Sequence, residues 1–400
     1  MGLDCYCNCH TEQGSIPVPP VDKTVDPINN LKNEELNYQE AYNRNFTTNK
    51  NDFKTNQSNK NDYENNNNNN NNIDNHKKNT EKNISEFDKN IKLYSIEMTE
   101  KEFISKINKK IKEIDSKFGS INQNKKDEYI KNKEKNIIFK SPLFFKETKN
   151  IYFGSWDIQT LKKEGWGILL DKDGNKYEGG WDKDIIDGYC RIISINGDYY
   201  EGEIANGIIE GNGIFYFDEK KMIYKGEFKN NCFDGDGEQI FQNFEKKIIY
   251  QGKFKNGKRE GIGKIIFEDG NIYEGEFSND NFNGEGCFRW TDGREYKGKW
   301  NNNKMNGKGI FIWDKNNWYE GEYKDNRREG FGIYQYGDNN YYEGKWLNNL
   351  PQGEGKINKD GKTVEGLFRY GKMIRNKNNK KEFNNIRNII NYTFKNESVN

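Results

Sequence analysis

Residues 296–318 read YKGKWNNNKMNGKGIFIWDKNNW, and Tyr319 then starts the same pattern again. The pattern is Tyr-x-Gly-x-aromatic, followed after a short polar segment by Gly-x-Gly and an apolar run. In an extended chain, alternate residues of the first part would share one face, and the charged residues between them would share the other. The sequence therefore predicts two strands, and so one β-hairpin, in each unit.

This unit recurs along the second half of the chain. Successive first tyrosines are 23 to 26 residues apart, and from Tyr250 to Tyr342 the step is always 23. Self-similarity at a fixed period indicates a repeat array, in which each unit packs on its neighbours. A further half-unit at residues 364–368 lacks the tyrosine and is expected to cap the array. The nine full units begin at Tyr152, Tyr177, Tyr200, Tyr224, Tyr250, Tyr273, Tyr296, Tyr319 and Tyr342.

The positions of the glycines, and of the residues that replace repeat residues, lead to further expectations. Glycine normally weakens a strand, so three glycines per unit at fixed offsets suggest that aromatic rings lie over bare backbone. Cys190 stands where a repeat glycine belongs and Ile204 where the aromatic belongs, so local geometry is expected to change in the second and third units. Five steps are expected to form two-residue turns with positive φ at both positions, namely Asp173-Gly174, Asn196-Gly197, Asp269-Gly270, Asp292-Gly293 and Asp360-Gly361.

These units resemble the membrane occupation and recognition nexus (MORN) repeat, whose pattern is Tyr-Glu-Gly-x-Trp, a glycine turn and Gly-x-Gly. The resemblance covers residues 152–370. It implies an all-β fold, an elongated single-layer antiparallel sheet of about nine hairpins. It also implies a scaffold that is often linked to membranes or to the cytoskeleton. We expect the repeat aromatics to line the face that binds partners; they are Tyr152, Trp156, Tyr177, Trp181, Tyr200, Tyr224, Phe228, Tyr250, Phe254, Tyr273, Phe277, Tyr296, Trp300, Tyr319, Tyr323, Tyr342 and Trp346.

Residues 1–10 form a candidate acylation segment. Removal of the first methionine would leave Gly2 free for a myristoyl chain, and stable anchoring would need a second chain. Palmitate on nearby cysteines would supply it, and Cys5, Cys7 and Cys9 are placed for this. Tyr6 stands where the myristoylation pattern prefers serine or threonine. There are two alternatives: a metal site built from the three cysteines and His10, and an untethered tail.

The rest of the N-terminal half contains one expected helix. Residues 11–98 are rich in asparagine and lysine and are expected to be a disordered linker. Thr99 and Glu102 form a capping box before an apolar stripe that ends at Gly119, which predicts an amphipathic helix over 99–119. We favour docking of this stripe on the repeat sheet or on a second helix. The lysines of the helix are the argument for the alternative, in which the helix lies on a lipid surface.

The segments that flank the array are expected to protect its edges. Residues 137–151 are expected to cap the first hairpin. Residues 371–400 form a polar tail with a short apolar cluster at Ile386, Ile389, Ile390, Tyr392 and Phe394 that could form a last cap.

Several classes of function are disfavoured by composition and motifs. A net charge of +1 gives no footprint for nucleic acid. No run approaches about 18 apolar residues and no apolar segment opens the chain, so neither a membrane-spanning helix nor a secretory signal is expected. The two histidines, His10 and His76, both lie in the expected linker or the acylation segment. The Gly-x-Gly pairs do not continue to a third glycine, so we expect no enzyme, no cofactor and no metal site.

The expected function is a non-enzymatic scaffold at the cytoplasmic face of the plasma membrane or cell cortex. Its expected ligands are protein partners and, in addition, phosphoinositides; Lys297, Lys299 and Lys345 occupy repeat positions where charge could meet lipid phosphate. Solvated lysines are the competing interpretation. The alternative is a soluble cytoskeletal or axonemal adaptor, with a homodimer as one form of its assembly.

Overall fold

The computed structural model describes residues 70–132, 137–243 and 246–377. All described residues from Lys82 onward belong to one compact unit. The candidate acylation segment, the linker up to residue 69 and the tail from residue 378 lie outside the described residues.

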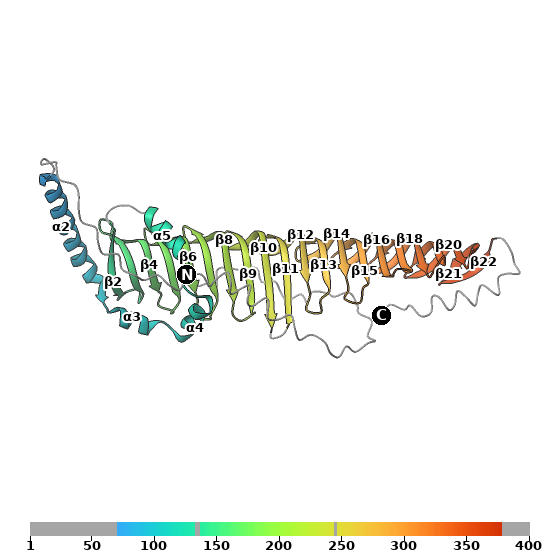
Figure 1. The fold of residues 1–400 in the computed structure, drawn as a ribbon, viewed down its shortest axis with the longest axis horizontal. Coiled ribbons are helices and arrows are strands. Elements are labelled where there is room, and N and C mark those ends of the chain that lie inside the picture. The colour runs from blue at the N-terminus through green and yellow to red at the C-terminus, as the bar shows by residue number, and fades with distance from the viewer. Residues whose placement is uncertain (1–69, 133–136, 244–245, 378–400) are drawn as a thin grey trace, which may run out of the picture. The chain divides into compact units, whose positions relative to one another are not determined.

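This unit is built on one antiparallel sheet of 22 strands, in which each strand pairs with the next along the chain (Figure 1). The expected all-β, single-sheet architecture is confirmed. The strands are β1 Ser95–Glu97, β2 Ile137–Phe145, β3 Ile151–Asp157, β4 Lys162–Leu170, β5 Lys176–Asp182, β6 Ile185–Ile193, β7 Tyr199–Ala205, β8 Ile208–Phe217, β9 Met222–Lys229, β10 Cys232–Asn243, β11 Lys246–Lys255, β12 Lys258–Ile266, β13 Ile272–Ser278, β14 Asn281–Arg289, β15 Glu295–Asn301, β16 Lys304–Asp314, β17 Asn317–Lys324, β18 Arg327–Tyr336, β19 Tyr341–Leu347, β20 Leu350–Lys359, β21 Lys362–Arg369 and β22 Lys372–Asn376.

The helix predicted over 99–119 is two helices, α3 (Glu100–Lys106) and α4 (Lys109–Phe118). Its start and end are as predicted, with the capping box at Thr99 and a left-handed Gly119 (φ 76°). The break comes at Ile107, which is extended, and at Asn108, whose side chain accepts a hydrogen bond from Lys110 N at 2.8 Å. Because that side chain caps a helix N-terminus, it starts a new helix where the apolar spacing alone predicts continuation.

The linker prediction is wrong for its last part, because α2 (Asn70–Tyr94) and β1 occupy residues 70–97. From Ile84 onward, α2 has apolar residues at helical spacing, and these pack on the first hairpin. Phe87 is 1% exposed and meets Trp156 edge-on, with ring centroids 5.9 Å apart. The segment expected to cap the first hairpin contains β2, which pairs with β1 on one side and β3 on the other. A further helix, α5 (Gln123–Asn132), precedes β2.

In every unit except the second, the tyrosine lies over the glycines of its hairpin. In the last full unit, a Cβ atom added to Gly344 or to Gly355 would lie 2.5 Å from the hydroxyl oxygen of Tyr342. The same hydroxyl donates to the carbonyl of Lys345 at 3.0 Å, and seven other units make the equivalent bond three residues ahead at 2.7 to 3.1 Å. The expectation that rings cover bare backbone is confirmed, and the fixed glycines follow from it.

The rings also link successive units. Tyr296 packs edge-on against Trp300 of its own unit, with centroids 5.1 Å apart, and against Tyr323 of the next unit, 5.2 Å apart. Edge-to-face pairs contribute about 0.5 to 1.5 kcal/mol beyond the area they bury. Three tryptophans, Trp181, Trp300 and Trp346, add a bond from Nε1 to a glycine carbonyl of the preceding unit.

Most turn predictions need correction. Asp360 and Gly361 both have positive φ (50° and 80°), as predicted, whereas at the other four steps only the glycine does. Those loops have three residues, as in the bond from Gly270 N to the Phe267 carbonyl at 2.9 Å, and end on a left-handed glycine. Two-residue turns with positive φ at both positions lie instead at the opposite end of the strands, as at Asn302 (φ 48°) and Asn303 (φ 64°).

These opposite-end turns stack on one another from unit to unit. Asn303 Oδ1 accepts a bond from Phe282 N at 2.7 Å, and Asn303 N donates to the Phe282 carbonyl at 3.1 Å. The same exchange joins Asn326 to Met305 and Asn349 to Arg328. The turn residue of one hairpin therefore completes the backbone hydrogen bonding of the hairpin before it.

The two departures from the repeat pattern differ in effect. A Cβ on Gly179 would lie 2.7 Å from the Cα atom of Cys190, and the hydroxyl of Tyr177 donates to Asp171 at 3.3 Å. The second unit is thus altered, as predicted. The third unit keeps the common geometry, because Ile204 is buried in the aromatic position and the hydroxyl of Tyr200 still donates three residues ahead.

Candidate functional site

All seventeen repeat aromatics predicted to line the binding face lie buried in the main core, each at most 8% exposed. They project from one side of the sheet, which we call the tyrosine face. Alternate residues, such as Tyr199 and Glu201 beside Tyr200, project from the opposite side. We call that side the helix face, because α3 and α4 pack on it.

The helix face is covered by the chain's own helices at the N-terminal end of the sheet (Figure 1). Phe103 of α3 packs with Ile151 and Leu170, which lie on β3 and β4. Ile111 and Ile114 of α4 pack with residues of β6 to β8. The apolar stripe predicted over 99–119 is therefore docked on the repeat sheet, as favoured above, and is not available to a lipid surface.

The α4 helix runs across the strands. Ile107, at its N-terminal end, packs in both helix-face clusters, and Phe118, at its C-terminal end, stacks on Tyr199 with centroids 4.1 Å apart. A helix turn rises about 5.4 Å and neighbouring strands lie about 4.8 Å apart, so a crossing helix can place about one apolar side chain on each strand. The row on which α4 lies is Ile193, Tyr199, Tyr216 and Ile223, each paired with the next across the strands.

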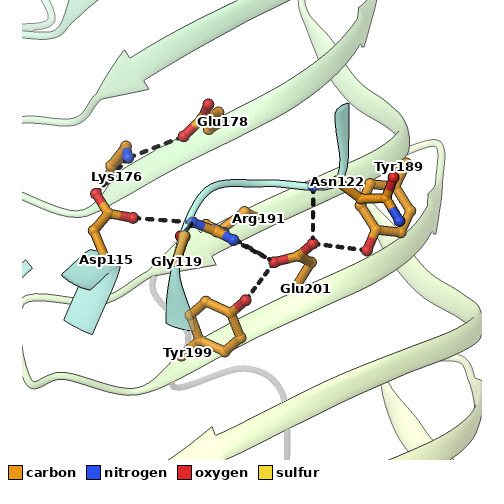
Figure 2. A network of polar contacts seen from close by, with 9 residues as sticks. All are labelled: Asp115, Gly119, Asn122, Lys176, Glu178, Tyr189, Arg191, Tyr199 and Glu201. Carbon is orange, nitrogen blue, oxygen red and sulfur yellow. Dashed lines mark hydrogen bonds and ion pairs between the residues drawn. The ribbon is translucent and has the colours of Figure 1, made fainter. Parts of the chain in front are cut away.

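A buried polar network fixes the position of α4 (Figure 2). The guanidinium of Arg191, which is 2% exposed, donates to Glu201 at 2.6 Å, to Asp115 at 3.3 Å and to the Gly119 carbonyl at 2.6 Å. Asp115 in turn pairs with Lys176 at 2.6 Å. The network thus joins α4 and its C-terminal end to β5, β6 and β7.

The two cations of this network, Arg191 and Lys176, face three carboxylates, which are Asp115, Glu178 and Glu201. Burial and the adjacent Glu201 carboxylate raise the pKa of Tyr199 and of Tyr189 well above the usual range, so both phenols stay protonated and donate to Glu201. Burial alone would lower the pKa of Arg191, but Tyr199, Glu201 and Asp115 outweigh it and raise that pKa. A buried ion pair with every group hydrogen-bonded acts as a clamp between helix and sheet.

The α5 helix docks on the sheet with an aromatic side chain, and Lys126 lies over the ring of Trp166. Tyr129 fits a niche left by two glycines: a Cβ on Gly180 would lie 2.5 Å from its Cζ atom, and one on Gly188 would lie 2.5 Å from its ring edge. Its hydroxyl donates to the Trp181 carbonyl at 3.0 Å. Other units carry a charged or longer residue at the position of Gly180, such as Glu203, so the niche is particular to this unit.

The row under α4 continues along the sheet as five isoleucines. Each pairs with the next across the strands, and all are half-buried. Among the described residues, the clusters that contain residues of α3 and α4 include only the first of these isoleucines, Ile223. We call this row the isoleucine stripe; it consists of Ile223, Ile240, Ile249, Ile266 and Ile272.

A polar row runs beside the isoleucine stripe, two residues away from it along each strand. It consists of Lys225, Glu238, Gln251, Lys264 and Glu274, again paired strand by strand. An apolar centre with a polar, solvent-accessible rim is the usual anatomy of a protein–protein interface. The stripe spans about 19 Å at the usual strand spacing, which equals about 13 residues of helix.

Sequence reasoning did not identify the stripe, although a signal was present. The residue just before the repeat tyrosine is isoleucine in three consecutive units, at Ile223, Ile249 and Ile272, whereas Glu295 holds this place in the next unit. The predicted lipid-contacting lysines Lys297, Lys299 and Lys345 are exposed. The glutamates that recur once per hairpin, Glu178, Glu201, Glu274, Glu320, Glu343 and Glu365, lie on the helix face.

The residues predicted to carry lipid, Gly2, Cys5, Cys7 and Cys9, lie outside the described part of the chain. No helix within the described residues is long and apolar enough to span a bilayer.

A family model, the MORN repeat, matches seven segments of the chain: 177–199, 200–219, 250–272, 273–293, 296–318, 319–341 and 342–361. A search of curated proteins finds no match. The units that begin at Tyr152 and Tyr224 lie outside the matched segments, yet their tyrosine hydroxyls make the common bond to the carbonyl three residues ahead.

Proposed function

We propose that this chain, which carries seven MORN repeats, is a non-enzymatic scaffold that binds an amphipathic helix of a protein partner on the isoleucine stripe. One observation carries this proposal. The chain's own α4 lies on the first part of the same row, and the row continues past the end of that helix. A partner helix would then lie end to end with α4 and place one aliphatic side chain on each of β10 to β13.

The proposal can be tested with a known helix as the probe. A labelled peptide of residues 99–119, which contains α4, is titrated into the full chain, where the native α4 site is already occupied. We expect a dissociation constant on the order of 10 μM, because the contact is short and apolar. A scrambled peptide of the same composition serves as the probe's control.

A matched pair of substitutions locates the site. Ile266→Lys places a charge in the stripe and should weaken peptide binding about tenfold or more. Ile262→Lys lies on the same strand, outside the stripe, at a side chain that is 64% exposed, and should leave binding unchanged. Equal affinity for both variants, or no binding to the unsubstituted chain, argues against the stripe as a helix site.

We propose further that this scaffold acts at the cytoplasmic face of a membrane or cell cortex. The support is the sequence alone: Gly2 for myristate, with Cys5, Cys7 and Cys9 for palmitate. Fractionation of cells that express the full chain or Gly2→Ala tests this tether. If acylation tethers the chain, Gly2→Ala should shift the protein into the soluble pool. An unchanged distribution would favour the soluble cytoskeletal or axonemal adaptor.

Phosphoinositide binding is a separate proposal. Lys297, Lys299 and Lys345 are exposed on the helix face. Lys299 lies opposite Glu285, whereas Lys297 lies between Cys287 and Ile310, and Lys345 lies opposite Phe331. Flotation of the full chain with liposomes, with and without phosphoinositides, tests it. Co-flotation that depends on the phosphoinositide and is lost when the three lysines are replaced by glutamine would support direct lipid contact.

A further inference from the structure

We propose that the C-terminal segment of this chain, residues 378–400, docks on a second apolar patch of the helix face. We call this surface the tryptophan patch; it consists of the half-buried residues Ile310, Ile312, Trp318, Ile333 and Tyr341. Strand pairing brings them together, since Ile312 faces Trp318, and Gln335 lies between Trp318 and Tyr341. The proposal concerns a surface other than the isoleucine stripe and stands independently of it.

The two apolar surfaces are separated by charge. Arg289 and Glu295, which pair at 3.2 Å, occupy the row between Ile272 and Ile312. In the row two residues away along each strand, Ile310 and Ile333 of the patch alternate with Glu320 and Glu343, and Lys356 and Glu365 follow. The patch therefore suits a segment with an apolar edge and basic flanks.

The C-terminal segment has this composition. Its apolar residues Phe383, Ile386, Ile390 and Phe394 follow the spacing of three, four and four residues that places them on one edge of a helix. The apolar edge that docks on the same face consists of Ile111, Ile114 and Phe118 of α4 and of Ile107 just before it, and it has steps of four, three and four. The segment carries four basic residues, Lys380, Lys381, Arg387 and Lys395, against two acidic ones.

The chain can reach the patch. β22 ends at Asn376, and β17, which carries Trp318, lies five strands away, or about 24 Å at the usual strand spacing. Residues 377–382, which precede the apolar edge, span up to about 20 Å when extended, and β19, which carries Tyr341, lies three strands from β22, or about 14 Å. The apolar edge can therefore lie over β16 to β19 without unpairing the last strands.

This arrangement divides the helix face into three parts. The N-terminal helices cover the row as far as Ile223, and the C-terminal segment would cover it from Ile312 to Tyr341. The isoleucine stripe between them would be the part left open to a partner.

Photo-crosslinking in the full chain tests the docking. The photoreactive residue p-benzoylphenylalanine replaces Ile390, on the expected docked edge, and in a control protein replaces Asn388, on the opposite side of the same helix. We expect crosslinks within one chain from position 390 to peptides between residues 310 and 341, at least fivefold more than from position 388. Equal yields from both positions, crosslinks to other strands, or crosslinks only between two chains would overturn the proposal.

Charge reversal gives a second, independent readout. The double change Glu320→Lys and Glu343→Lys should reduce the crosslink from position 390 about tenfold, because it replaces attraction by repulsion. Glu274→Lys, at the equivalent exposed position beside the isoleucine stripe, is the matched control and should leave the yield unchanged. A yield that does not respond to the double change would contradict the charge complementarity on which the proposal rests.

Discussion

Tyr224 lies flat over Gly237 of the neighbouring strand, so closely that a Cβ atom on Gly237 would be 2.5 Å from the tyrosine hydroxyl oxygen and 2.6 Å from the ring. The ring is held there by two edge-on aromatic contacts, to Phe228 and Phe254, each with centroids 5.1 Å apart. No side chain fits at Gly237 unless the ring or the strand moves. The regular glycines therefore exist to admit the tyrosines.

The change Gly237→Ala should lower the free energy of unfolding by about 2 to 3 kcal/mol, because it overpacks this contact. Gly237 does not have positive φ, so the cost would be steric. Gly293→Ala is the control: it has no atom within 4 Å of its added Cβ but a φ of 94°, and should cost about 1 kcal/mol from backbone strain. Urea unfolding of both variants measures the difference; similar losses would contradict ring-over-glycine packing.

The stacking of turns from unit to unit gives a graded prediction at Asn303. Asn303→Gly keeps the left-handed backbone but loses the bond from Phe282 N, and should cost about 1 kcal/mol. Asn303→Ala loses the bond and adds backbone strain, for a total of about 2 kcal/mol or more. Thermal unfolding should rank native chain, glycine variant and alanine variant in that order. An alanine variant as stable as the glycine variant would mean that the turn is not strained.

The clamp at Arg191 should be expensive to break. Arg191→Met leaves Glu201 and Asp115 without their buried partner and should cost about 3 to 5 kcal/mol. Arg289→Met removes an ion-paired arginine that is 49% exposed and should cost less than about 1 kcal/mol. Hydrogen exchange should speed up over residues 109–118 in the first variant alone. Unchanged exchange of α4 in Arg191→Met would show that the apolar contacts hold the helix without the clamp.

Thiol reactivity should depend on pH in a site-specific way. Burial, followed by the charge of Glu295, raises the pKa of Cys287 to about 11. Because the thiolate reacts, its alkylation rate should rise about tenfold per pH unit from pH 8 to 10 and level off near pH 11. Glu295→Gln removes a charge that raises this pKa and should speed alkylation at pH 8. Mass spectrometry of the alkylated peptides gives the rates, and a plateau below pH 9 would contradict the raised pKa.

The repeat fold was predictable because its cause is local. Tyrosine, glycine and aromatic at fixed offsets specify the ring-over-glycine contact within one hairpin, and the same contact recurs in every unit except the second. Cys190 shows the limit of this reasoning. Its presence predicted a change in the second unit, but the new bond from Tyr177 to Asp171 depends on a loop that the repeat pattern does not describe.

Other features depend on contacts that sequence spacing does not encode. The apolar stripe over 99–119 predicted one helix, yet Asn108 caps a second helix, because two shorter helices fit two clusters on the sheet. The isoleucine stripe emerged only from strand register, which aligns Ile240, in the second strand of its unit, with Ile249, in the first strand of the next. The repeat pattern places charged residues between the repeat aromatics on this face, and it does not indicate an apolar row among them.

A methyl spectrum of the full chain with isoleucine labelling shows whether the isoleucine stripe receives a helix. On addition of the peptide of residues 99–119, the methyl signals of Ile240, Ile249, Ile266 and Ile272 should shift, and that of Ile262 should not move. Shifts confined to other isoleucines, or no shift at a saturating peptide concentration, would contradict a helix site on this stripe.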